Sequence, residues 1–255
     1  MTSKAKEGSL STNIANKIAT IEFGHPASNS FPSSLLDRLT EELHQISQNK
    51  EVSVIVLKSD GDKAFCAGAS FNELVAIDNL EDGKKFFSGF ANVINAMRTC
   101  SQLIIGAVQG KIVGGGVGLA AACDYVLATE AAAIKLSELS IGIGPFVIAP
   151  AVERKIGVAA LAELSIAATT WKNATWAKEK GLFAHVFETQ QELRTETTLL
   201  AEKLASYNPQ ALSEMKKIFW EGTAHWNTLL AERASISGTL VVSEFTKNAL
   251  FKFKK

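Results

Sequence analysis

LIIGAVQGKIVGGGVGLAAACDYVLAT, residues 103–129, carries the alternation that decides the fold. Its two ends, Leu103–Gln109 and Asp124–Thr129, are apolar runs that contain β-branched residues, as expected for buried strands. Between them lie a glycine-rich stretch, Gly110–Gly118, and a run of small residues, Leu119–Cys123, for which we predict a helix. Strands that alternate with helices are typical of an α/β fold whose sheet is mainly parallel.

The same alternation extends to both sides of this stretch. Strand patterns occupy Ile18–Phe23, Val52–Lys58 and Ala184–Glu188. Helical spacing of apolar residues occupies Leu35–Gln48, Phe71–Ile77, Lys84–Arg98, Gln191–Ser206, Pro209–Glu221, Trp226–Ser237 and Ser243–Lys254. After about Trp171 we expect only one strand, Ala184–Glu188. We therefore predict an α/β core over residues 1–190 and a helical C-terminal region over residues 191–255.

The composition excludes several kinds of protein. With 255 residues and 47% hydrophobic content, the chain is long enough for one large core. Lys and Arg together number 26, as do Asp and Glu, which argues against the broad basic surface that nucleic-acid binding needs. The four histidines are scattered without the spacing of metal ligands, so we expect no metal site.

Cysteine usage and hydropathy bear on the compartment. Cys66, Cys100 and Cys123 are odd in number and form no Cys-x-x-Cys pair, which argues against a disulfide framework. The first residues, MTSKAKEGSLSTN, lack the apolar stretch of a signal peptide. The longest apolar run, Ile112–Ala122, is too short to span a bilayer. We expect a soluble protein of the cytoplasm.

Two segments of small residues follow predicted strands. They are KAFCAGAS, residues 63–70, and GKIVGGGVG, residues 110–118. Where a strand gives way to a helix, backbone N–H groups are unpaired and can donate to an anion. Two such ends side by side could form an oxyanion hole. The alternative is that the small residues serve only tight packing of helix on sheet.

The glycine-rich stretch does not match the common nucleotide-binding motifs. It lacks the Gly-x-Gly-x-x-Gly spacing of a dinucleotide fingerprint. The run from Gly106 to Lys111 is one residue short of a P-loop, and Ile112 stands where that motif needs Ser or Thr. Both nucleotide interpretations therefore fail on the residues themselves.

Glu138 lies among apolar and small residues in LSELSIGIGP, residues 136–145. A carboxyl group in such surroundings would have a raised pKa and could exchange protons near neutral pH. The alternative is a surface glutamate that caps a helix or forms an ion pair.

The end of the chain is basic with interleaved aromatic residues. The segment FKFKK, residues 251–255, is either a solvated helix end or a phosphate-binding tail.

Taken in order, these segments resemble the enoyl-CoA hydratase/isomerase (crotonase) family. The resemblance runs from about Ile18 to the end of the chain. It rests on residues 64–69, on Gly114–Gly116 with the Ala-Ala-Cys-Asp-Tyr that ends at Tyr125, and on Ser137-Glu138 with Gly142 and Pro145. The resemblance implies a twisted ββα spiral core, a helical C-terminal trimerisation region, and trimers that often pair into hexamers.

The family's functional positions carry over onto this sequence. The backbone N–H groups of Ala69 and Gly115 would bind the thioester oxygen of an acyl-CoA, and Glu138 would be the acid/base. The CoA and acyl groups would contact Ala27, Ala67, Ser70, Phe71, Asn72, Gly114 and Phe146. The N–H of Phe146 falls where family hydratases help to hold a water. CoA would enter as part of the substrate, so no separate cofactor is implied.

Three positions depart from the family's pattern. Gly118 occupies the position at which hydratases with two glutamates have the first one. Ser70 occupies a position that is commonly Asp in the family, and Phe146 occupies one that is commonly Gly. Hydration needs a base for water and a proton donor for the α-carbon, and two carboxyl groups share that work readily. Moving a double bond needs only one base, so Gly118 favours isomerisation on chemical grounds.

The wider sequence favours hydration. The segment from Ser137 to Gly157 is similar to bacterial 3-methylglutaconyl-CoA hydratases of leucine degradation, which also look to lack the first Glu. We therefore predict an enoyl-CoA hydratase of that type, in which Arg154 or Lys135 could bind the terminal carboxylate of the substrate. The alternatives are a Δ3-Δ2-enoyl-CoA isomerase and a catalytically silent protein that binds CoA esters.

Overall fold

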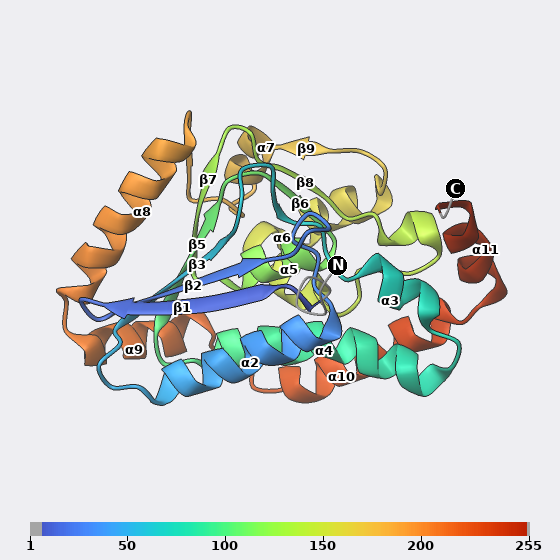
Figure 1. Ribbon diagram of the computed structural model, residues 1–255, viewed down its shortest axis with the longest axis horizontal. Helices are drawn as coiled ribbons and strands as arrows, with labels where there is room; N and C mark the ends of the chain where they lie inside the picture. The colour runs from blue at the N-terminus through green and yellow to red at the C-terminus, as the bar shows by residue number, and fades with distance from the viewer. Residues whose placement is uncertain (1–6, 254–255) are drawn as a thin grey trace.

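Two β-sheets form the centre of the protein, whose computed structural model describes residues 7–253 (Figure 1). The larger sheet has the strand order β1-β2-β3-β5-β7-β10. Its strands are β1 (Ser9–Ala15), β2 (Ile18–Gly24), β3 (Val54–Ser59), β5 (Leu103–Val108), β7 (Tyr125–Thr129) and β10 (His185–Phe187). All neighbours pair in parallel except β1 and β2, which are antiparallel. The predicted mainly parallel sheet is confirmed.

The smaller sheet is built from short strands in the order β4-β6-β8-β9. These strands are β4 (Ala64–Cys66), β6 (Lys111–Val113), β8 (Ala133–Lys135) and β9 (Lys172–Asn173). The first three are parallel, and β9 is antiparallel to β8. Each long strand β3, β5 and β7 is followed by a short strand of the second sheet and then by a helix. This repeated unit is the ββα spiral that the family resemblance implies.

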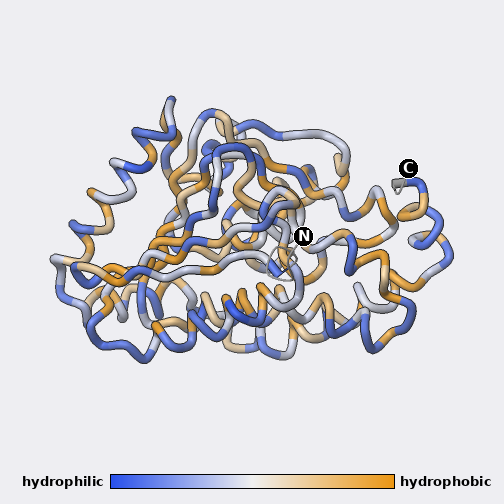
Figure 2. The backbone as a smooth tube through the Cα atoms, in the orientation of Figure 1, coloured by the Kyte–Doolittle hydropathy of each residue, from blue (hydrophilic) through white to orange (hydrophobic). Residues whose placement is uncertain are grey.

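Helices cover both faces of the larger sheet. In Figure 1, α2 (Ser33–Gln48), α4 (Leu80–Thr99) and α10 (Trp226–Val241) run side by side below it, while α8 (Gln190–Ala205) lies against the other face. The apolar stripe predicted for α2 is buried. Figure 2 shows the hydrophobic segments gathered in the strands and the inner helices, so the core lies between these layers.

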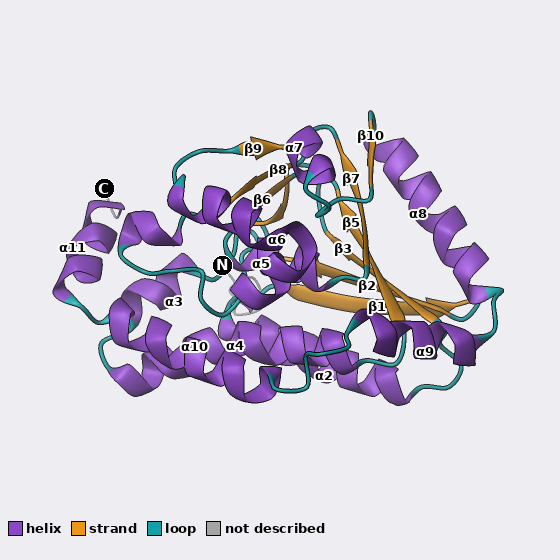
Figure 3. Ribbon diagram, turned by 180° about the vertical axis from the view of Figure 1, so that it is seen from behind, coloured by secondary structure: helices purple, strands orange, loops and turns teal. Residues whose placement is uncertain are grey.

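The remaining helices connect and close the spiral, as the view from behind in Figure 3 shows. They are α3 (Phe71–Ala76), α5 (Gly115–Ala122), the 3-10 helix η1 (Glu138–Ile141), α6 (Ala149–Ile166), α7 (Ala174–Glu179), α9 (Pro209–Phe219) and α11 (Glu244–Phe253). Helix α5 is buried along almost its whole length, because its glycines and alanines let neighbouring elements approach from every side.

The differences from the sequence-based expectation have simple physical causes. The strands β4, β6, β8 and β9 are too short to show a two-residue period, and the expectation of a single strand after Trp171 was wrong because of β9. Strand β1 was missed because it is polar and lies at the sheet edge. Helix α5 begins at Gly115 instead of Leu119, and α6 and α7 were not predicted. Residues 191–253 contain helices only, although Lys254 and Lys255 lie outside the described residues and the division at residue 190 stays a prediction.

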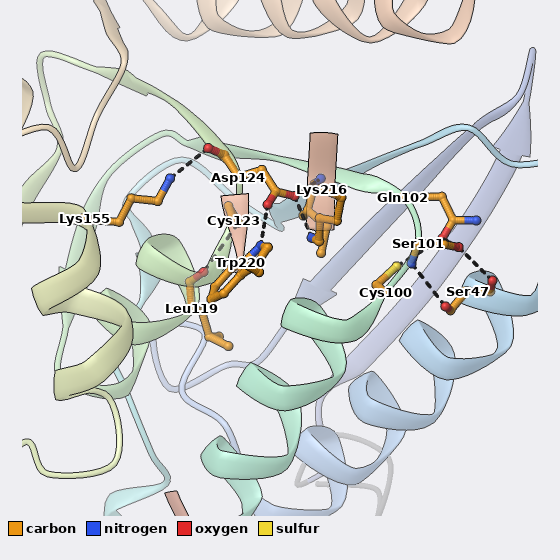
Figure 4. Close-up of polar contacts among 11 residues, drawn as sticks. Ser47, Cys100, Ser101, Gln102, Leu119, Cys123, Asp124, Lys155, Lys216 and Trp220 are labelled. Atoms are coloured by element: carbon orange, nitrogen blue, oxygen red, sulfur yellow. Dashed lines mark hydrogen bonds and ion pairs between the residues drawn. The ribbon is translucent and has the colours of Figure 1, made fainter. Parts of the chain in front are cut away.

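Asp124, immediately before β7, connects four parts of the fold (Figure 4). Its Oδ2 accepts hydrogen bonds from the backbone N–H of Ile104 at 2.7 Å and from Lys216 Nζ at 2.6 Å, and its Oδ1 accepts one from Trp220 Nε1 at 2.7 Å. Lys155 Nζ donates to the Asp124 carbonyl oxygen at 2.8 Å. The side chains of Asp124 and Lys216 are only 3% and 2% exposed. This buried ion pair fixes α9, from the C-terminal region, to the core.

Within residues 7–253, no helix combines the length with the apolar composition that crossing a bilayer requires.

We predict that Lys216→Ala lowers the free energy of unfolding by about 3–5 kcal/mol, because it leaves the Asp124 carboxylate buried without its cation. Lys217 offers a matched control, since it pairs with Glu214 on the surface. Lys217→Ala should change stability by no more than about 1 kcal/mol. Urea unfolding of both variants measures the difference, and equal effects would show that the buried pair does not hold α9.

Candidate active site

The carboxyl ends of β4, β6 and β8 meet at one pocket of about 180 Å³. The three strands are neighbours in register, so the segments that follow them are brought together although they lie far apart in the chain. Those segments supply Ala67, Gly68, Ala69, Gly114, Gly115, Ser137 and Glu138 to the pocket lining. The three segments singled out in the sequence therefore form one site.

Ala69 lines this pocket, and its backbone N–H is unpaired within the described residues. A parallel bridge joins Ala69 to Phe31. In this bridge the Phe31 N–H donates to the Gly68 carbonyl oxygen, and the Ser70 N–H donates to the Phe31 carbonyl oxygen. That bridge uses the groups on either side of the Ala69 N–H, which finds no acceptor among residues 7–253. An unpaired N–H of this kind is available to a ligand oxygen.

Gly115 supplies a second free donor beside the first. It is the first residue of α5, where the N–H has no partner within the helix. Gly114 before it has φ +53°, which glycine adopts without strain, and donates its own N–H to the Lys135 carbonyl oxygen at 3.0 Å. A β-carbon on Gly68 would lie 3.5 Å from the Gly115 nitrogen, so the two segments are in direct contact. Ala69 and Gly115, whose N–H groups have no acceptor among the described residues, thus line the same pocket, as an oxyanion hole would require.

Glu138 places its carboxyl group against Gly114. A β-carbon on Gly114 would lie 2.9 Å from Oε1, so glycine lets the carboxyl group approach the backbone closely there. Its Oε2 is buried and has no hydrogen-bond partner among the described residues. Burial raises the pKa of Glu138 to about 7. A carboxyl group with such a pKa can both take and give a proton near neutral pH. The alternative of a capping or ion-paired surface glutamate is wrong.

The segment that carries Glu138 is held by its own turn and by α11. The N–H of Ile143 donates to the Glu138 carbonyl oxygen at 3.0 Å, and Gly142 closes η1 in the left-handed conformation. A β-carbon on Gly142 would lie 2.6 Å from Thr246 Oγ1 of α11. The C-terminal helix therefore packs directly on the turn that positions the acid/base.

The position of the missing first glutamate is filled from another segment. Gly118 lies in α5, and a β-carbon there would lie 2.6 Å from Ile148 Cβ. Ile148 itself lines the pocket. The space that a side chain at this position would enter is therefore already occupied, and Glu138 is the only carboxyl group in the described lining of the pocket.

Apolar side chains form the rest of the pocket wall. They are Phe71, Leu74, Phe86, Phe87, Phe90, Val113, Ile141, Ile143, Pro145, Phe146, Val147 and Ile148. One further polar residue, Ser237, comes from α10. The described lining contains no Lys, Arg or His. Sequence reasoning missed most of this wall, because phenylalanines on the inner face of a helix such as α4 look the same whether they face a core or a ligand.

Several predicted contact residues lie at or beyond the edge of the pocket. Ala27 and Asn72 are exposed and are not part of its lining, although the loop of Ala27 is tied to it by a hydrogen bond from Ala67 N–H to the Ser28 carbonyl oxygen at 3.1 Å. The hydroxyl of Ser70 accepts from the Glu73 N–H at 3.4 Å and caps α3. These residues remain predictions for the CoA path.

The two cations suggested for a terminal carboxylate do not reach the pocket. The Arg154 guanidinium lies over the Trp220 ring at 4.3 Å, beside the Asp124 cluster. Lys135 Nζ lies over the Trp171 ring at 4.6 Å. Neither residue lines the pocket. Of the proposed phosphate-binding tail, Lys254 and Lys255 lie outside the described residues.

The nearby thiol of Cys66 is not suited to act as a nucleophile. Burial raises its pKa to about 12, so the reactive thiolate is scarcely populated at neutral pH. Its sulfur instead accepts a hydrogen bond from the Gly68 N–H at 3.3 Å. Cys66 thus helps to shape the turn that presents the Ala69 N–H.

Comparisons with known proteins agree with this geometry. A family model described as enoyl-CoA hydratase/isomerase matches residues 13–249. A probable enoyl-CoA hydratase of Bacillus subtilis (strain 168) is 26% identical over 96% of this chain and 95% of its own length. The mitochondrial methylglutaconyl-CoA hydratase of Rattus norvegicus is 33% identical, over 64% of this chain and 52% of its own length. The crystal structure of an enoyl-CoA hydratase from Bacillus halodurans superposes with a TM-score of 0.88 at 19% identity, covering 95% of this chain and 99% of that one.

We predict that Gly118→Ala destabilises the protein by about 1–3 kcal/mol, because the new methyl group collides with Ile148. That clash outweighs the gain of about 1 kcal/mol that Ala normally brings to a helix. In an Ile148→Ala background the same substitution should cost much less, since the obstruction is gone. Denaturant unfolding of the two single variants and the double variant measures this coupling, and strictly additive effects would contradict it.

The raised pKa of Glu138 predicts a pH-dependent effect of Glu138→Gln on stability. Between the ordinary pKa of 4.5 and about 7, the unfolded chain ionises this carboxyl group while the folded protein keeps it protonated. The wild-type protein therefore loses stability as the pH rises through this range, by about 3 kcal/mol in total. Glutamine does not ionise, so the free energy of unfolding of the variant, relative to that of the wild-type protein, should increase by that amount over this pH range. Unfolding measured from pH 4 to pH 8 tests this, and a constant difference would mean that Glu138 is not desolvated.

Proposed function

Because the chain belongs to the enoyl-CoA hydratase/isomerase family, we propose that it is an enoyl-CoA hydratase that works with a single carboxyl group, that of Glu138. The observation that carries this proposal is the buried, unpartnered Oε2 of Glu138 in the same pocket as the free N–H groups of Ala69 and Gly115. A site of this kind combines a proton carrier with donors for a developing negative charge.

The oxyanion donors stabilise the charge that forms during the reaction. The thioester carbonyl oxygen accepts hydrogen bonds from the N–H groups of Ala69 and Gly115. When a nucleophile adds to the β-carbon, the electron pair of the double bond moves to that oxygen and forms an enolate. Each donor of this kind contributes roughly 10²–10³ in rate, because it is aimed in advance at the atom that becomes charged.

Glu138 carries both protons in turn. In its ionised form it takes a proton from water, whose oxygen bonds to the β-carbon of the enoyl group. The same carboxyl group then gives its proton to the α-carbon as the enolate collapses, which returns Glu138 to its ionised form. Atoms balance with one water consumed, and the N–H of Phe146 is the proposed partner of that water.

Isomerisation is the second candidate, and the filled position at Gly118 favours it. With Ile148 in the place of a second carboxyl group, the site has one proton carrier. Glu138 would remove a proton from the α-carbon of a 3-enoyl-CoA and return it to the γ-carbon, while the same two N–H groups hold the dienolate. No water takes part in this reaction. A catalytically silent protein is the least favoured alternative, because the site residues converge.

The acyl group proposed from the sequence is 3-methylglutaconyl. Similarity to methylglutaconyl-CoA hydratases supports it. The apolar lining weighs against it, because a terminal carboxylate would meet no cationic side chain among the described pocket residues. A short, branched enoyl group without a second charge fits this lining better.

We also propose a homotrimer, or a hexamer of two trimers, in the cytoplasm. Large apolar side chains are exposed on α9, α10 and α11, which is typical of a surface that a partner covers: Ile218, Phe219, Ile236, Phe245 and Phe251. The three cysteines are free and buried, in keeping with a reducing compartment.

An assay in isotopically labelled water tests the proposed reaction. The purified protein is incubated with 3-methylglutaconyl-CoA, with an apolar branched 2-enoyl-CoA and, separately, with a 3-enoyl-CoA. Hydration predicts a product that gains the mass of one labelled water from a 2-enoyl ester. A shifted double bond in the 3-enoyl ester, with no water gained by any substrate, would make the protein an isomerase.

Glu138→Gln is expected to lower kcat/KM in this assay by roughly 10²–10⁴, since the amide cannot carry a proton. Binding of a saturated acyl-CoA should change little, because the N–H donors remain. Glu153→Gln, on the exposed side of α6, is the matched control and should leave the rate unchanged. Full activity of the Glu138→Gln protein would remove Glu138 from the mechanism.

A further inference from the structure

Ser237 is a polar residue that α10 places in the wall of the acyl pocket. It is only 1% exposed and lines the pocket together with Phe86 and Phe87 of α4. Its hydroxyl forms no hydrogen bond with any described residue, and its oxygen is not among the fully buried atoms without a partner, which belong to Thr12, Glu138 and Thr197. An unpartnered hydroxyl in a pocket lining that is not fully enclosed can meet water or a ligand that enters the pocket.

The neighbouring hydroxyls on the same helix behave differently. Ser235 Oγ donates to the Ala231 carbonyl oxygen at 3.1 Å, and Thr239 Oγ1 donates to the Ser235 carbonyl oxygen at 3.1 Å. These two side chains satisfy themselves within the helix, as serine and threonine commonly do. Ser237 does not, although it is the most deeply buried of the three.

Close contact between α4 and α10 brings Ser237 to the pocket. A β-carbon on Gly83 would lie 2.9 Å from the Gly238 Cα, so the two helices touch backbone to backbone beside Ser237. The other buried positions on α10 are apolar or glycine: Trp226, Leu230, Ala234, Gly238 and Val241. Packing alone would be served equally well by alanine at position 237, which leaves the hydroxyl without a structural role.

The chemistry of the pocket defines what this hydroxyl can bind. The other polar side chains of the described lining are Ser137 and Glu138, and no cation is among them. A carboxylate would lose its hydration here and meet only a second carboxyl group. An uncharged oxygen can exchange a hydrogen bond with Ser237 without that cost.

We propose that Ser237 is a specificity residue that hydrogen-bonds an uncharged oxygen, a hydroxyl or a keto group, on the acyl chain of the substrate. This inference rests on the proposed function and adds to it a substrate class, enoyl-CoA esters with an oxygenated acyl chain. The apolar wall around Ser237 holds the carbon chain, and the serine selects the substituent.

Matched pairs of 2-enoyl-CoA esters of increasing chain length test the proposal. Each pair consists of an unsubstituted ester and the same ester with a terminal hydroxyl group. The wild-type protein should favour the hydroxylated ester in at least one pair by roughly 3- to 10-fold in kcat/KM, as expected for one hydrogen bond to a group that is otherwise unsatisfied. Ser237→Ala should abolish that preference and leave the unsubstituted ester within about twofold. Ser235→Ala, two residues away on the same helix, should change neither value.

The outcomes separate this inference from the proposed function. Equal losses for both members of every pair in Ser237→Ala, or no preference in the wild type, would overturn the role of Ser237 while hydration stands. If the wild-type protein turns over no enoyl ester, the proposed function fails. The role of Ser237 is then tested by calorimetry, which measures the binding of the corresponding pairs of saturated acyl-CoA esters. The same preference in affinity, lost in Ser237→Ala, would support it, and its absence would overturn it.

Discussion

Parallel pairing of β4, β6 and β8 is the constraint on which the site depends. Three-residue strands contribute little stability by themselves, but their register fixes where the chain leaves the sheet on each turn of the spiral. Because the strands are parallel and adjacent, all three exits lie at one edge, as ligand sites in α/β folds commonly do. Ala69, Gly115 and Glu138 are therefore positioned by backbone pairing, which requires small residues at the exits.

That arrangement places unsatisfied groups at the site, and the rest of the fold must compensate for their cost. Two backbone donors without acceptors and a desolvated carboxyl group all work against folding. The Asp124 cluster shows the opposite design, since each of its buried charges and donors is matched. It ties the C-terminal helices to the core, and those helices in turn reach the site twice, through α11 behind Gly142 and through α10 beside Phe86. Stability and chemistry are thus supplied by different polar groups linked through the same helices.

The sequence alone revealed the parts of the site that depend on backbone geometry. Small residues after strands are visible in any sequence, and they indicated the segments that the structure brings together at one pocket. The roles of Ala69, Gly115 and Glu138 came from the family resemblance and stay predictions. The α/β alternation and most long elements were equally visible from their periodicity. The short strands escaped notice because three residues show no period. The pocket wall escaped because Phe86 or Ser237 on an amphipathic helix carries no mark of facing a ligand, and which helix reaches the site depends on long-range packing between α4 and α10.

The contact between Gly118 and Ile148 also limits how the chain could change over time. A larger side chain at Gly118 is accepted only after Ile148 has become smaller, while a smaller residue at Ile148 first opens a void in the wall. Neither step is favourable by itself, so the effects of substitutions at the two positions depend on each other. A lineage with this pairing would lose easy access to two-carboxylate chemistry, and new activities would arise more readily by changing the acyl pocket than by rebuilding the proton-transfer machinery.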